Sequence, residues 1–131
     1  MADILQQLHS RNLETRLKAA ATLQEQLANR AVPESQIAPT VEALMKLVGR
    51  ETDDSCRATA LMALCSRANE VSIQPIVELL GEFGKLSLIE ALCLIGEAGD
   101  RAYLPTLATY LNHTDPDVRT AAAEAYAVLA D

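Results

Sequence analysis

The chain has 131 residues and a formal net charge of −7, and half of its residues are apolar although 3% are aromatic. A chain of this length buries enough surface for one domain, and small aliphatic side chains suit closely packed helices. No apolar run reaches the roughly 18 residues that span a bilayer, and the start of the chain lacks the basic and apolar segments of a signal peptide. We therefore expect one cytoplasmic domain over residues 1–131, without a membrane partner.

The acidic charge is concentrated in the second half of the chain. Residues 67–131 contain ten Asp or Glu against four Lys or Arg. A nucleic-acid groove needs Lys and Arg to replace counterions, so this balance disfavours nucleic-acid binding. The cysteines, Cys56, Cys65 and Cys93, each lie among apolar residues, which is typical of buried free thiols in a reducing compartment.

The predicted helices alternate along the chain between two types, which we name A and B. An A helix of the later units has a proline two residues after a large apolar residue, and proline is tolerated in the first turn of a helix. A B helix has apolar residues at +3, +7 and +11 from a basic residue, which keeps one apolar stripe on the same side for three turns. In chain order, we predict an A helix over 3–9, a B helix from Arg16, an A helix at Pro39, a B helix from Arg57, a short A helix at Pro75, a B helix from Lys85, an A helix at Pro105 and a B helix capped by Thr114 or Asp115.

The B-helix stripes predict which residues form the core. They comprise Ala19, Leu23 and Leu27; Ala60, Leu64 and Ala68; Leu88, Leu92 and Gly96; and Ala122, Tyr126 and Ala130. Turn residues between the helices divide the chain into approximate units 1–30, 33–69, 72–97 and 101–131, of which the first is truncated.

Three segments of the second half carry a family resemblance: Ile89–Asp100, Tyr103–Leu107 and Asp115–Arg119. Together they resemble the HEAT-like repeats first noted in phycobilisome lyases. The resemblance is strong over residues 84–130 and moderate over 35–69. It implies an all-α fold, a right-handed α-solenoid of antiparallel helical hairpins with about 3.5 repeats.

The resemblance also implies a ladder of hydrogen bonds and ion pairs between neighbouring hairpins. In the family, the Asp and Arg of a D-x-x-V-R segment form it. Asp53 with Arg57 and Asp115 with Arg119 match that pattern. Lys85 takes the place of the Arg in the third unit and is included in the predicted ladder, although it lacks the planar five-donor fork of Arg.

Candidate catalytic and ligand-binding residues have simpler structural interpretations. His113 lies beside Thr114 and Asp115, but these residues suit a turn and a helix cap. The three cysteines have no His at zinc-ligand spacing. The segment Gly96–Gly99 follows a helix rather than a strand, so we interpret it as a helix-ending turn and not a phosphate loop. The sequence predicts no catalytic residue, cofactor or metal site.

For function, the resemblance implies mostly binding, as a protein-interaction scaffold or adaptor that uses the concave face lined by B helices. Apolar residues group in the middle of that face and indicate a binding patch, unless neighbouring B helices bury them. A basic partner surface would complement the acidic rim. The alternatives are a subunit of a bilin lyase or isomerase, a chain that forms the N-terminal part of a longer array, and self-association through the terminal repeat. The candidate partner-binding residues are Leu61, Met62, Leu86, Ile89, Glu90, Cys93 and Glu124.

Overall fold

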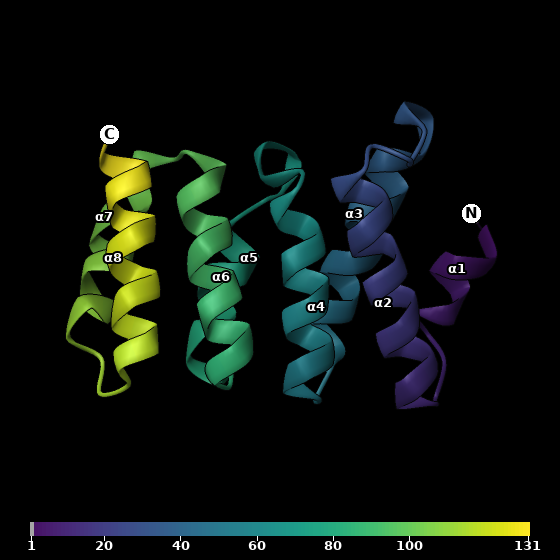
Figure 1. Cartoon of the computed structure of the whole chain (residues 1–131), viewed down its shortest axis with the longest axis horizontal. Coiled ribbons are helices and arrows are strands. Elements are labelled where there is room, and N and C mark those ends of the chain that lie inside the picture. The colour runs from purple at the N-terminus through teal and green to yellow at the C-terminus, as the bar shows by residue number, and fades with distance from the viewer. Residues whose placement is uncertain (1) are drawn as a thin grey trace.

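The computed structural model describes residues 2–131, and in that range the chain is helical with no strand. Four helices lie side by side in one layer: α2 (Leu13–Ala28), α4 (Asp54–Cys65), α6 (Lys85–Ala98) and α8 (Pro116–Ala130) (Figure 1). These are the predicted B helices, in the predicted order. The second layer contains α3 (Glu34–Arg50), α5 (Gln74–Leu79) and α7 (Leu104–Thr109), and α1 (Ala2–Gln7) lies at the N-terminal end. The protein is thus an all-α helical repeat solenoid.

The core runs continuously through the array, from Leu8 at one end to Leu129 at the other. The middle residue of each predicted stripe lies at its centre in three units, where Leu23, Leu64 and Leu92 are fully buried. In α8 the stripe is less deeply buried, because Tyr126 lies on the last helix of the described layer and keeps part of its side chain exposed.

Most B helices begin at a capping side chain of their own. Asn12 accepts a hydrogen bond from the Thr15 backbone N–H, and Asp53 accepts one from Cys56. Asp115, rather than Thr114, caps α8 and is followed by proline at the start of the helix. Such caps satisfy N–H groups that have no partner inside the helix. Helix α6 differs, because the residue before it is Gly84 and supplies no capping side chain.

The A helices differ from the prediction in one respect. Pro75 and Pro105 lie in the first turn of α5 and α7, as predicted. Pro39 instead lies inside α3, which begins at Glu34. The earlier start is favoured because it buries Ile37 in the core while Pro39 stays exposed. The predicted short third A helix is confirmed; α5 has six residues, as has α7, and a 3-10 turn continues each, at Leu80–Glu82 and Tyr110–Asn112.

Helices α6 and α8 approach most closely at Gly96. Gly96 lies inside α6, so the predicted turn begins later than expected. Of the two glycines in that predicted turn, Gly99 adopts the left-handed conformation that ends the helix. A Cβ atom at position 96 would lie 2.9 Å from Cα of Ala125 in α8. The absence of a side chain therefore sets the spacing of the two helices.

Replacing Gly96 with Ala should separate α6 from α8. The added methyl group meets backbone, which has little freedom to move, and such overpacking costs about 1–3 kcal/mol, more than the roughly 1 kcal/mol that Ala gains over Gly in a helix. We expect a net loss of stability in urea unfolding. Gly49→Ala in α3 is the matched control, because a Cβ there meets nothing within 4 Å; that variant should be at least as stable as the parent protein.

Introducing a charge into the central stripe tests the core itself. Leu92 is fully buried between the two layers, whereas Leu86 on the same helix is 52% exposed. We expect Leu92→Asp to lower the free energy of unfolding by about 3 kcal/mol or more, because an unpaired carboxylate would be buried. Leu86→Asp should leave thermal unfolding followed by circular dichroism nearly unchanged. Equal destabilisation by both would contradict the assignment of the stripe.

Candidate functional site

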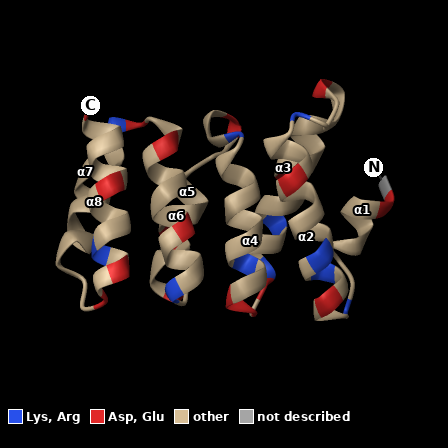
Figure 2. Ribbon diagram, viewed as in Figure 1, with Lys and Arg blue, Asp and Glu red and all other residues tan. Residues whose placement is uncertain are grey.

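The N-terminal ends of the B helices lie along one edge of the molecule, where basic and acidic residues gather (Figure 2). The most buried pair joins Arg16 of α2 to Glu51, which precedes α4. Arg16 donates two hydrogen bonds to the Glu51 carboxylate, at 2.7 and 3.1 Å. The same carboxylate accepts from the backbone N–H groups of Thr52 and Asp53, and its side chain is 1% exposed. All of these bonds favour the charged carboxylate.

Burial by itself would raise the pKa of Glu51. The bonds from Arg16 and from the Asp53 backbone outweigh it and lower the pKa from 4.5 to about 2. The pair is therefore charged at neutral pH, and it connects the first hairpin to the second.

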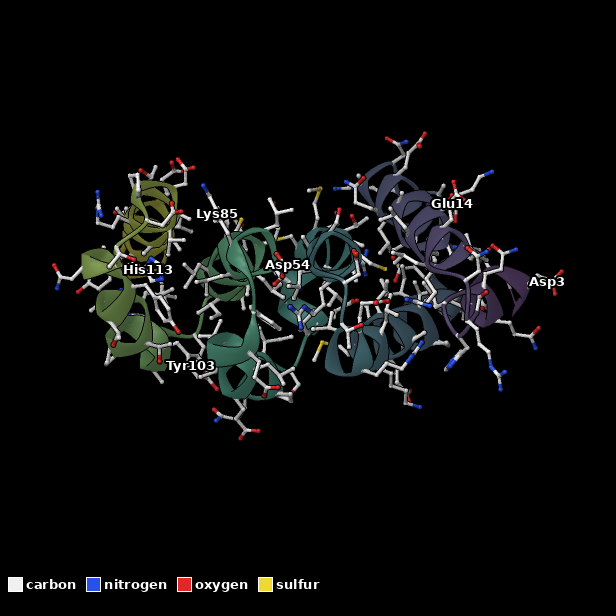
Figure 3. The ribbon with its side chains drawn as sticks, turned by 90° about the horizontal axis from the view of Figure 1, so that it is seen from below. Asp3, Glu14, Asp54, Lys85, Tyr103 and His113 are labelled. Atoms are coloured by element: carbon white, nitrogen blue, oxygen red, sulfur yellow. The ribbon has the colours of Figure 1, made fainter. Side chains whose placement is uncertain are left out.

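Helix α6 is capped from the neighbouring B helix. The Asp54 carboxylate of α4 accepts hydrogen bonds from the backbone N–H groups of Gly84, Leu86 and Ser87, at 2.9, 3.0 and 3.3 Å, and from the Ser87 hydroxyl. Figure 3 shows Asp54 between the two helices. Although burial opposes it, these bonds and one from Arg57 lower the pKa of Asp54. Asp54 thus supplies the cap that Gly84 cannot provide.

The last two B helices are connected by Lys85 of α6 (Figure 3). Its ammonium lies 3.2 Å from the Asp115 carboxylate and 2.7 Å from that of Asp117. Because Lys85 is about half exposed, desolvation of its ammonium costs little free energy. Exposed pairs of this kind contribute little to stability.

The layer of B helices has a separate, apolar feature on its outer face, between α6 and α8. Ile89 and Cys93 of α6 and Ala121 and Val128 of α8 line a groove of about 230 Å³ there. Val128 is 52% exposed. We name this the α6–α8 groove; Gly96 and Ala125 form its floor where the helices approach most closely.

Three carboxylates, Glu90, Glu97 and Glu124, border the α6–α8 groove, and no Lys or Arg lines it. Within residues 2–131 none of the three has an ion pair. Partial burial raises the pKa of Glu90. The groove therefore combines apolar walls with negative charge that the protein itself does not neutralise.

A second groove follows between α4 and α6. It is lined by Met62 and Thr59 of α4 and by Leu86, Ile89 and Glu90 of α6. Met62 and Leu86 are 41% and 52% exposed. Because Ile89 and Glu90 line both grooves, the two form one surface across three B helices. We name this surface the B-helix face.

A model of the HEAT repeat family matches residues 104–131, which span α7 and α8. This chain is a HEAT-like repeat protein. The match lies where the sequence resemblance is strongest, and the earlier hairpins stack in the same two layers. The closer resemblance to phycobilisome lyases, and with it the bilin-lyase alternative, stays a prediction. A comparison with curated proteins found no match.

The HEAT-like array brings together six of the seven predicted partner-binding residues. Met62, Leu86, Ile89, Glu90, Cys93 and Glu124 all line the B-helix face. Leu61 was predicted to be on this surface, and that prediction is wrong, because its side chain is fully buried. Leu61 belongs to the hydrophobic core that α4 forms with α2, α3 and α6.

Of the predicted ladder residues, Lys85 and Asp115 join neighbouring units, whereas Asp53, Arg57 and Arg119 make their hydrogen bonds within their own unit. Asp53 caps its own helix, while Arg57 bonds to Asp54 and to the Glu51 carbonyl and lies over the Phe83 ring. Arg57 makes no ion pair with α6, because the first turn of that helix contains no carboxylate. Arg119 likewise donates to carbonyl groups of its own turn, those of His113 and Thr114.

Contacts between neighbouring units include the ion pair of Lys85, a predicted ladder residue, with Asp115 and that of Arg16 with Glu51. The sequence analysis missed Glu51 and Asp54 because it considered only the Asp and Arg positions of the D-x-x-V-R pattern. Repeating the comparison with an offset of one unit, about 30 to 35 residues, is the signal that would have found them.

His113 accepts a hydrogen bond from the Asp115 backbone N–H through Nδ1, so it belongs to the turn before α8 as predicted. No group of three or more His, Cys, Asp or Glu in residues 2–131 is arranged to hold a metal ion. No helix in that range is long and apolar enough to cross a bilayer.

The Glu51 carboxylate should make stability depend on pH. Because folding lowers its pKa, its contribution is complete above the ordinary value of 4.5 and is lost as the pH falls toward about 2. Glu51→Gln should cost on the order of 2–3 kcal/mol at pH 7, and the cost should shrink across that window in urea unfolding. Glu42→Gln is the control: its side chain is 68% exposed in an ion pair with Lys46, so its effect should stay below about 0.5 kcal/mol.

Proposed function

We propose that this protein is an interaction scaffold or adaptor that binds a segment of a partner protein on its B-helix face. HEAT repeats generally mediate protein–protein interactions, and the match to residues 104–131 extends that role to this chain in general terms. The observation that supports this particular face is the α6–α8 groove, where exposed apolar side chains lie beside three carboxylates that form no ion pair within residues 2–131. Exposed apolar patches rimmed by polar residues mark interaction sites.

The charges of the groove indicate the chemistry of the partner segment. Apolar side chains would enter between Ile89 and Val128, and Lys or Arg side chains would lie beside Glu90, Glu97 and Glu124. An acidic partner would meet uncompensated repulsion from the same three residues. We therefore infer an amphipathic basic segment, which presents both kinds of side chain together, as an amphipathic helix does.

The opposite layer is a weaker candidate for the same role. A groove between α3 and the segment that contains Glu70 and Ser72 also has apolar walls and three carboxylates, Glu34, Glu42 and Glu70. All three have partners within the protein, because Glu34 and Glu70 bond to Arg67 and Glu42 pairs with Lys46. Two cations thus offset most of the charge of the three carboxylates, so this groove offers less attraction to a basic segment.

A charge introduced at the centre of the B-helix face should abolish partner binding. Ile89 lines both grooves, so Ile89→Asp should weaken binding of a fluorescent Leu/Lys amphipathic peptide by tenfold or more, about 1.4 kcal/mol, measured by anisotropy. Because Ile89 is partly buried against the core, Val128→Asp serves as a second variant that changes an exposed side chain. Circular dichroism should show unchanged helicity.

The charge contribution is tested separately. The triple variant Glu90→Gln, Glu97→Gln and Glu124→Gln should bind the basic peptide more weakly and with less dependence on salt. Glu78→Gln in α5, on the other layer, is the matched control and should bind as the parent protein does. Equal binding of a Leu/Glu peptide, or equal loss in the control, would contradict the proposal.

A further inference from the structure

Two cysteines from neighbouring B helices lie in direct contact. Cys65 is at the end of α4 and Cys93 is in α6, 28 residues further along the chain. Their sulfur atoms are 3.6 Å apart, and the Cys65 thiol donates a hydrogen bond to the Cys93 sulfur. A disulfide holds its sulfur atoms about 2 Å apart, so an approach of about 1.5 Å through side-chain rotation would join them.

The two thiols have unequal access to solvent. Cys93 is exposed and lines the α6–α8 groove, whereas Cys65 is partly buried and packs against the core. An oxidant therefore reaches Cys93 first, and Cys65 lies behind it. This arrangement of an accessible thiol poised next to a resolving thiol is the one that redox-sensitive cysteine pairs share.

We propose that Cys65 and Cys93 form a redox-active pair that reacts with hydrogen peroxide or another small neutral peroxide. In the first step the Cys93 thiolate attacks one peroxide oxygen, the O–O bond breaks, hydroxide leaves and is protonated to water, and Cys93 becomes a sulfenic acid. In the second, Cys65 attacks the Cys93 sulfur, the S–O bond breaks and a second water leaves as the S–S bond forms. The two thiols lose two electrons and two protons, and the peroxide is reduced to two molecules of water.

The surroundings of Cys93 select among oxidants. The carboxylates of Glu90, Glu97 and Glu124 all lie near enough to act on the Cys93 thiolate. They repel an anionic oxidant such as glutathione disulfide but leave a neutral peroxide unaffected. The class of substrate follows from this charge and from the open side of the groove.

Hydrogen bonding supports the assignment of the two roles. The bond from the Cys65 thiol lowers the pKa of Cys93, against the opposing effects of burial and of the three carboxylates. The same bond, together with burial, raises the pKa of Cys65. Cys56 differs in access, because its side chain is fully buried. Burial and the neighbouring Glu51 also raise its pKa to about 12, and a fully buried protonated thiol is inert toward peroxide.

Oxidation would also change the α6–α8 groove, because the Cys93 sulfur would turn from the groove wall toward α4. This consequence for partner binding rests on the proposed function. The chemistry of the pair does not, so the test measures the thiols alone and its failure would leave the proposed function standing.

The experiment treats the reduced full chain with a small excess of hydrogen peroxide, removes the peroxide, alkylates the remaining thiols in denaturant and maps the products by peptide mass spectrometry. We expect a disulfide between the Cys65 and Cys93 peptides in monomeric protein, reversed by dithiothreitol, with Cys56 alkylated throughout. Glutathione disulfide at the same concentration should produce the bond more slowly, by on the order of tenfold. Free alkylation of all three thiols after peroxide, or disulfides between molecules only, would overturn the proposal.

Three serine variants assign the steps. Cys65→Ser should leave a sulfenic acid on Cys93 that dimedone traps, because the resolving thiol is missing. Cys93→Ser should give neither the disulfide nor a dimedone adduct, and Cys56→Ser should behave as the parent protein does. Circular dichroism checks that each variant is folded. Dimedone labelling of Cys65 in Cys93→Ser, at the rate seen for Cys93 in Cys65→Ser, would show that the two roles are not distinct.

Discussion

The parallel packing of the B helices imposes one electrostatic constraint on the rest of the structure. Their N-terminal ends lie along the same edge, and each end carries a partial positive charge and N–H groups without partners inside the helix. Carboxylates along that edge offset this charge: Glu51, Asp54 and Asp115 each accept backbone N–H bonds there. Part of the acidic charge of the protein is therefore structural, whereas within residues 2–131 Glu90, Glu97 and Glu124 of the B-helix face form no ion pair.

The fold was predictable because the spacing of individual apolar residues along each helix reveals the repeat. A buried Leu23, Leu64 or Leu92 needs only helical spacing to be recognised, and all three are in the core. The start of α3 was not predictable in the same way. A proline usually marks the first turn of a helix, whereas Pro39 lies inside α3. Burial of Ile37, a tertiary effect, outweighed that local signal.

The site was predictable only in part, because its contacts join different units. Spacing along one helix correctly grouped Leu86, Ile89 and Cys93, but it also included Leu61, which is buried in the core that α4 forms with neighbouring helices. The cap that Asp54 gives to α6 and the contact between Cys65 and Cys93 need a known lateral register of two helices. A pattern within one helix does not contain that register.

The cap on α6 gives the array a direction of assembly. Asp54 precedes Gly84 by 30 residues, so during synthesis on the ribosome α4 emerges complete before α6 begins. The carboxylate that satisfies the first turn of α6 is then already in place on a folded surface, and the new helix is started by its predecessor rather than by its own residues. Asp54 thus favours folding of the repeats in the order of translation, because it caps the helix of the repeat that follows.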